Sequence, residues 1–191
     1  MMNWYEKLNE YFPIEEMKSK KHMELLLEDP NGFYQKDEGS EHVMIYAEFD
    51  TCIFVDYLWV AAESRGHGTG HKLMDKLKQK MKPILLEVEP IDPNVIDTNR
   101  RLNFYQREGF KHAKSIIFLN HSFQTKEIAP LEILYWSLED EKQGFIFEQM
   151  KKIYQSVHIY KSLEIYGREF GDVDEVLQLD ENRNTRDLLT V

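Results

Sequence analysis

The chain is poor in cysteine, in long apolar runs and in positive charge, and each shortage excludes a class of protein. Its one cysteine, Cys52, cannot form an internal disulfide framework and suits a reducing cytoplasm. No apolar stretch resembles a leader at the N-terminus or is long enough to cross a bilayer, so we expect no membrane partner. The 34 Asp and Glu residues outnumber the 24 Lys and Arg, and the net charge of −10 argues against nonspecific nucleic-acid binding.

The length of 191 residues suits one domain with a full hydrophobic core. The sequence has no internal repeat, no low-complexity tract and no sign of a second domain. From Gly167 onward it becomes acidic and polar. We therefore expect a single domain over residues 1–166 and an acidic C-terminal extension over residues 167–191.

The order of apolar periodicities and turn residues predicts an α/β fold. We expect helices at residues 3–11, 14–28, 70–82, 97–108 and 140–166, and strands at residues 42–49, 52–60, 84–89, 115–119 and 131–137. A hairpin that feeds a βαβα unit gives a mixed sheet with helices on both faces. Helix 140–166 is expected to pack on the domain, and a homodimer contact is the alternative for its apolar side.

A glycine-rich turn, Arg65-Gly66-His67-Gly68-Thr69-Gly70, connects the strand that ends at Val60 to the next helix. Glycines allow a tight turn with inward N–H groups, the helix N-terminus adds positive potential, and Arg65 supplies a cation. The turn therefore predicts a phosphate or pyrophosphate site. No Lys-Ser or Lys-Thr follows the last glycine, which argues against a P-loop, and the G-x-G-x-G spacing departs from a Rossmann turn. A glycine-rich connection without a ligand is the alternative.

The R-x-x-G-x-G pattern of residues 65–70 resembles the signature of the GNAT superfamily of acyl-CoA N-acyltransferases. Residues 101–110 are similar to the R-x-x-F-Y-x-x-x-G-F segment of many bacterial members, and residues 56–60 are similar to the strand that enters their loop. The three blocks stand in the family's order and spacing. The resemblance is strongest over residues 43–119.

The resemblance implies a GNAT-like fold, with a mixed, mostly antiparallel central sheet, and acetyl-CoA as co-substrate. It places the coenzyme's pyrophosphate on the glycine-rich turn and its pantetheine arm at the end of strand 52–60. The residues expected to bind acetyl-CoA are Leu58, Trp59, Val60, Arg65, Gly66, His67, Gly68, Thr69, Gly70 and His71. We expect no metal site, because His67 and His71, although four residues apart, have no carboxylate or cysteine to complete a ligand set.

Acyl transfer to an amine needs an acid for the departing thiolate and a route by which the ammonium loses its proton. The resemblance implies that Tyr105, in the Phe-Tyr pair, is the acid. Plain aromatic packing is the alternative for this tyrosine.

For the base, strand alternation places Phe54, Asp56, Leu58 and Val60 on one face. An aspartate in apolar company is costly unless it is paired or functional, so Asp56 is the first choice. Glu87 and Glu89 on the next strand are the reserve candidates. The alternative is that each carboxylate only pairs with an arginine such as Arg100 or Arg101.

The sequence therefore predicts an N-acetyltransferase that transfers the acetyl group of acetyl-CoA to a primary amine, of a small molecule or a peptide, by direct attack in a ternary complex. A non-catalytic acyl-CoA-binding protein with a sensory or structural role is the alternative. An interaction module that acts through helix 140–166 is the third hypothesis, and it predicts no coenzyme binding.

Overall fold

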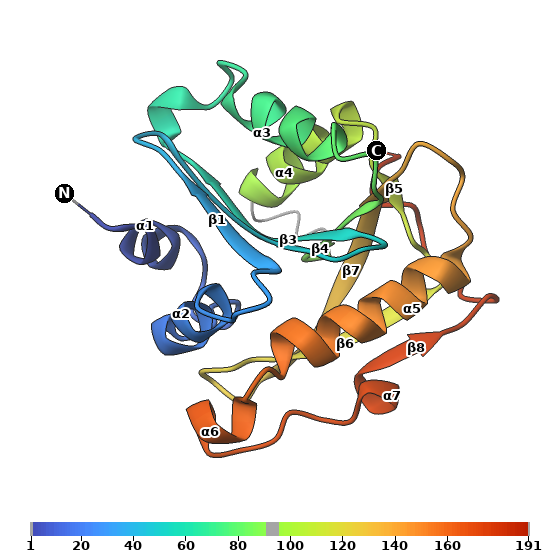
Figure 1. Ribbon diagram of the computed structural model, residues 1–191. Helices are drawn as coiled ribbons and strands as arrows, with labels where there is room; N and C mark the ends of the chain where they lie inside the picture. The colour runs from blue at the N-terminus through green and yellow to red at the C-terminus, as the bar shows by residue number, and fades with distance from the viewer. Residues whose placement is uncertain (1, 91–95, 191) are drawn as a thin grey trace.

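The computed structural model describes residues 2–90 and 96–190, and in this part of the chain eight strands form one sheet (Figure 1). The strand order is β1-β2-β3-β4-β7-β6-β8, with β5 beside β7. The strands are β1 Tyr34–Glu38, β2 His42–Glu48, β3 Ile53–Val60, β4 Ile84–Val88, β5 Lys111–His112, β6 Ile116–His121, β7 Ile128–Trp136 and β8 Leu177–Leu179. The pair β3–β4 is parallel and the other pairs are antiparallel. The predicted mixed, mostly antiparallel sheet is confirmed.

Helices cover both faces of the sheet, as predicted (Figure 1). The helices are α1 Trp4–Tyr11, α2 Lys20–Leu27, α3 Thr69–Lys78, α4 Ile96–Arg107, α5 Gln143–Ile153, α6 Ser162–Tyr166 and α7 Val173–Val176, with a 3-10 turn, η1 Ala62–Ser64, and a π-helix, η2 Tyr154–His158. Leu8, Met23 and Met150 belong to a core that joins α1, α2 and α5 to one face. Leu77 and Leu102 belong to a second core that joins α3 and α4 to the other. No helix in the described residues combines the length and the apolar character needed to cross a membrane.

The predicted helix over residues 14–28 is wrong in its first half, because α2 begins only at Lys20. The Ser19 side chain caps it by accepting a hydrogen bond from the His22 N–H. The preceding segment is fixed by Tyr57, whose hydroxyl donates to the Glu16 carbonyl (2.8 Å) and accepts from the Lys18 N–H (3.0 Å). These distant bonds use backbone groups that a helix would have paired internally.

The structure adds β1, which the sequence analysis did not predict. β1 pairs antiparallel with β2, from Tyr34 opposite Ala47 to Glu38 opposite Val43. Its residues after Tyr34 are Gln, Lys, Asp and Glu. Such a polar strand has too few apolar residues for alternation to be recognised.

A β-bulge interrupts the regular alternation of β3. Ile45 of β2 faces Tyr57, but the next residue, Tyr46, faces Val55, so Asp56 is an extra residue on β3. A bulge shifts the alternation by one residue. Phe54 accordingly lies in the core with α1, α2 and α5, whereas Leu58 packs on the core with α3 and α4. The prediction that Phe54, Asp56, Leu58 and Val60 share one face is therefore wrong.

The predicted single helix over residues 140–166 is also wrong. α5 continues into the π-helix η2, and α6 begins after Lys161, whose φ of 47° breaks the helical path. Beyond residue 166, where the sequence predicts an extension, β8 pairs antiparallel with β6. Leu188 and Leu189 are buried in the core that contains α3 and α4. Residues 177–189 thus contribute to both the sheet and the core.

We predict that Leu177→Ala lowers the free energy of unfolding by about 2–5 kcal/mol, because truncating a buried leucine loses apolar contact and leaves a cavity. Leu177 is 1% exposed, whereas Leu179 on the same strand is 36% exposed. Leu179→Ala is therefore the matched control, with an expected cost below about 1 kcal/mol. Urea denaturation measures both, and equal costs would show that β8 does not belong to the core.

Candidate active site

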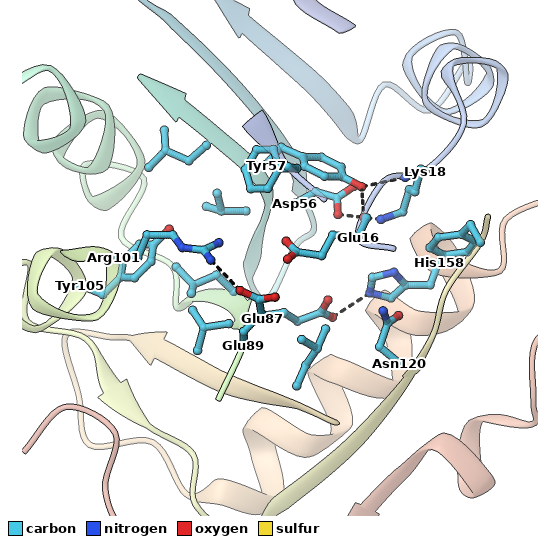
Figure 2. A pocket seen from close by; sticks show the side chains of 17 residues that line it. Glu16, Lys18, Asp56, Tyr57, Glu87, Glu89, Arg101, Tyr105, Asn120 and His158 are labelled. Atoms are coloured by element: carbon cyan, nitrogen blue, oxygen red, sulfur yellow. Dashed lines mark hydrogen bonds and ion pairs between the residues drawn. The ribbon is translucent and has the colours of Figure 1, made fainter. Parts of the chain in front are cut away.

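The candidate site lies where two neighbouring strands separate. β3 and β4 pair only from Ile53–Ile84 to Val55–Leu86, and beyond this point β4 continues along β7. A cavity of about 80 Å³ lies at the separation, lined by Asp56, Glu87 and Tyr105 among others (Figure 2). We call it the inner cavity. The structure thus brings together the three residues that the sequence predicts as catalytic.

A second cavity, of about 380 Å³, adjoins the first, and we call it the outer cavity. Four residues line both cavities: Glu16, Glu89, Asn120 and Leu131. The outer cavity is further bounded by Pro13 and Glu15 ahead of α2 and by the turn that connects β6 to β7. The two cavities therefore meet at these shared residues, close to where β3 and β4 separate.

Asp56 is held in a buried ion pair. One carboxylate oxygen contacts Lys18 Nζ at 2.7 Å, and the other accepts the Tyr34 hydroxyl at 2.5 Å. The side chains of Lys18 and Asp56 are 2% and 4% exposed. Lys18 Nζ also lies 5.3 Å and 5.4 Å from the ring centres of Tyr57 and Phe123. Both charges are thus removed from water, and each depends on the other for compensation.

Glu87 is bound by a histidine from the π-helix. His158 Nε2 lies 2.8 Å from Glu87 Oε1, and the pair is visible at the edge of the inner cavity (Figure 2). The imidazole is packed among Phe54, Phe118 and Phe123. A π-helix is a frequent feature of functional sites, and here it brings His158 to β4. The sequence analysis did not predict this contact.

Glu89 pairs with an arginine, which is the alternative that the sequence left open. Arg101 Nη2 lies 2.7 Å from Glu89 Oε2. Beside them lies Glu16, which the sequence analysis missed because residues 14–28 read as a helix. Burial, and then the adjacent Glu89, raises the pKa of the Glu16 carboxyl to about 8. Its Oε1 atom is buried and has no hydrogen-bond partner among the described residues.

Tyr105 projects from α4 toward the inner cavity (Figure 2). Burial raises the pKa of its phenol to about 12. The phenol therefore keeps its proton at neutral pH and is able to donate it.

The helix that carries Tyr105 ends as the sequence predicts, because Gly109, with φ of 79°, follows the last turn of α4.

The predicted anion turn follows directly on β3 through η1. Gly66 and Gly68 have φ of 81° and 86°, a conformation that costs other residues energy. Gly70 has a different purpose: a Cβ there would lie 3.1 Å from the Phe104 ring, so this glycine lets α3 approach α4. Two glycines shape the turn, and the third one permits helix packing.

The side chains of the turn are held in different ways. Arg65 Nε donates to the Val60 carbonyl at 3.0 Å, and its guanidinium lies 4.8 Å from the Tyr11 ring centre. His71 Nδ1 lies 2.9 Å from Glu108, and Nε2 lies 3.1 Å from Asp75. The expectation that no carboxylate stands near His71 is therefore wrong. Lys78 also contacts Glu108, at 2.6 Å, so this group joins α3 to the end of α4.

Comparison with known proteins assigns the chain to a family. The family model of the acetyltransferase (GNAT) domain matches residues 29–112. YjbC of Bacillus subtilis (strain 168), described as a candidate acetyltransferase, is 56% identical over 178 residues, which are 93% of each chain. The chain belongs to the GNAT superfamily. A GNAT-family structure from Bacteroides thetaiotaomicron shares the fold, with a TM-score of 0.59, 24% identity and coverage of 87% of this chain and 91% of the other.

Membership of the GNAT superfamily makes the protein an acyl-CoA-dependent acetyltransferase. The separated strands, the glycine turn and Tyr105 all lie within residues 29–112, the range that the GNAT domain model matches. The segment before α2 and the π-helix lie outside the matched range. Glu16, Lys18 and His158 thus come from outside the matched range.

We predict that Lys18→Met destabilises the protein by about 3–5 kcal/mol, because it leaves the Asp56 carboxylate buried without its counter-charge. The double variant Lys18→Met/Asp56→Asn is expected to regain part of this loss. Lys20→Met is the matched control, since the Lys20 side chain is 49% exposed in its pair with Glu24. Urea denaturation measures the free energy of unfolding of all three variants. A loss in Lys18→Met as small as the loss in Lys20→Met would contradict the buried ion pair.

Proposed function

We propose that the protein is a cytoplasmic N-acetyltransferase that transfers the acetyl group of acetyl-CoA to a primary amine by direct attack in a ternary complex. One observation carries the proposal: two cavities meet where β3 and β4 separate, at the end of the strand that leads into the glycine turn. A donor that lies along β3 and an acceptor in the outer cavity would meet beside Tyr105. No covalent enzyme intermediate is needed in this arrangement.

The donor would bind along β3 and the turn that follows it. Past Val55 the β4-facing edge of β3 has no ladder partner in β4, so backbone groups of residues 58–60, other than the Val60 carbonyl that Arg65 holds, would be open to the pantetheine arm. Amides in the first turn of α3 have no partner within the helix and point toward an anion at its N-terminus. With Arg65 beside them, residues 65–71 suit the pyrophosphate. In this proposal His71 contributes its amide, because its side chain is turned to Glu108.

Tyr105 would act as the acid. The amine nitrogen attacks the thioester carbonyl carbon, the C–N bond forms, and the C–S bond breaks with its electron pair on sulfur. The thiolate takes the phenolic proton of Tyr105, and the phenolate recovers a proton from the nitrogen as the amide forms. Burial keeps the pKa of Tyr105 above the neutral range, so the phenolic proton is present when the thiolate departs.

The roles of Asp56 and Glu87 as bases stay predictions. Both carboxylates line the inner cavity. Both oxygens of Asp56 are already engaged, so a proton taken there would have to displace Lys18 or Tyr34. Glu87 is engaged at one oxygen by His158. These contacts favour a role for the two carboxylates in holding Lys18 and His158 at the cavity wall.

The first test is thiol release from acetyl-CoA across a panel of primary amines. We expect turnover with at least one amine, and a loss of kcat of about 100-fold in Tyr105→Phe, since general acids contribute about 10²–10⁴-fold. The affinity for acetyl-CoA, measured by calorimetry, should be unchanged in the variant. Tyr46→Phe is the matched control, because it removes a hydroxyl bonded to Gln35 in β1.

Saturable acetyl-CoA binding without turnover on any amine would instead support a non-catalytic acyl-CoA-binding protein. The absence of any coenzyme binding would contradict both functions. Equal effects of Tyr105→Phe and Tyr46→Phe on kcat would contradict the acid role of Tyr105.

We also predict that Gly68→Ala weakens acetyl-CoA binding by about 10-fold. The left-handed conformation costs a residue with a Cβ roughly 1–2 kcal/mol, and relief of this strain would move the amides of the turn. Gly144→Ala in α5 is the matched control, because nothing lies within 4 Å of the added Cβ and alanine favours a helix. Calorimetry with acetyl-CoA compares the two, and unchanged affinity in Gly68→Ala would contradict the assignment of the turn.

A further inference from the structure

Two glutamates from different parts of the chain meet at the junction of the inner and outer cavities. Glu16 comes from the segment before α2, and Glu89 follows the last residue of β4. Both side chains line both cavities, and their carboxyl groups lie near each other beside Arg101 (Figure 2). A molecule that passes from the outer to the inner cavity has to pass this pair.

The pair has one guanidinium for two carboxylates. Arg101 contacts Glu89 at 2.7 Å, while the Oε1 atom of Glu16 is buried without a hydrogen-bond partner among the described residues. Two adjacent carboxylates in a poorly solvated site disfavour the doubly ionised state. The adjacent Glu89 adds to the effect of burial in raising the pKa of Glu16, so the protonated form of Glu16 is favoured at neutral pH.

The other carboxylates of the inner cavity are engaged by partners. Asp56 is held by Lys18 and Tyr34, and Glu87 is held by His158. Glu16 differs from them because it has an acceptor atom with no donor. It also lines the outer cavity, in which the proposed function places the acceptor.

We propose that Glu16, held beside Glu89 and Arg101, is the base that takes the proton from the acceptor's ammonium group. This assignment rests on the proposed function and supplies the base for the deprotonation of the acceptor. An N–H bond of the ammonium breaks, its electron pair stays on nitrogen, and the proton forms an O–H bond with the ionised Glu16 carboxylate. The neutral amine then attacks the thioester, and Glu16 returns its proton to solvent through the outer cavity.

The chemistry of the pair suits this transfer. A carboxyl with a pKa of about 8 is a much stronger base than an ordinary glutamate, so proton transfer from an alkylammonium is less unfavourable. The base is ionised only above this pKa, so kcat/KM should rise with pH through about 8. The charged and titratable groups around Glu16 are Glu15 and Lys18 of its own segment, Asp56 and Tyr57 of β3, Glu87 and Glu89 at β4, Arg101 and Tyr105 of α4, and His158 of η2.

The first experiment compares the pH dependence of kcat/KM in the full chain, with an alkylamine found active in the panel. The wild type should show an ascending limb near pH 8, and Glu16→Gln should lose this limb together with at least about 100-fold of kcat at its plateau. Glu10→Gln is the matched control, because it removes the same charge from an exposed position of α1 that lines neither cavity, and it should keep the limb. Glu89→Gln should move the limb to lower pH, since it removes the negative charge beside Glu16.

The second experiment replaces the alkylamine by hydroxylamine, whose nitrogen is largely neutral at pH 7. Because this acceptor needs no deprotonation, the turnover rate of Glu16→Gln with hydroxylamine should lie within a few-fold of the wild-type rate. A merely structural defect would reduce turnover of both acceptors alike. Calorimetric affinity for acetyl-CoA reports in parallel whether the variant is folded.

The outcomes separate the two proposals. A wild-type protein that acetylates no amine contradicts the proposed function itself. A wild-type protein that is active, with a Glu16→Gln variant that keeps both its rate and its ascending limb, overturns the assignment of Glu16 alone. Loss of activity with both acceptors while acetyl-CoA still binds also overturns it.

Discussion

The separation of β3 from β4 after three paired residues is the constraint on which the site depends. A sheet normally satisfies each strand edge with its neighbour, and here the second half of β3 is released from that pairing. The bulge at Asp56 accompanies the separation, because it bends β3 and redirects its side chains. The opening, the turn that follows β3, and the approach of α4 with Tyr105 all follow from this one departure from a regular ladder.

Opening the sheet brings polar groups into the interior, and the flanking segments compensate them. Lys18 neutralises Asp56, and His158 binds Glu87. Both partners come from outside the strands, from the segment before α2 and from the π-helix. The irregular backbone of these two segments places Lys18 and His158 against the two carboxylates. A regular helix at either place would direct these side chains elsewhere. Glu16 differs from these groups, because its Oε1 atom is buried without a hydrogen-bond partner among the described residues.

The sequence predicted those parts of the site that depend on local rules. The glycine turn, the strand before it and the Phe-Tyr helix follow from residue type and spacing, and the structure places them as expected. Asp56 was found because a carboxylate in an apolar strand is costly, but its orientation was wrong, since a bulge depends on the partner strand and leaves no signal in β3 alone. Glu16 was missed because the Tyr57 hydroxyl, distant in sequence, prevents the helix that residues 14–28 otherwise favour. The polar strand β1 and the short strand β8 were missed because they form by pairing with β2 and β6, and their own residues carry little strand signal.

The bulge in β3 and the π-helix η2 each insert one residue into a regular element, and this has an evolutionary consequence. Deleting one residue from a strand reverses every side chain beyond it, and deleting one from a helix turns the rest by about 100°. Asp56 and His158 therefore tolerate conservative exchange better than a change in the length of the elements that carry them. The position of both side chains at the inner cavity thus depends on the number of residues in each element as much as on their identity.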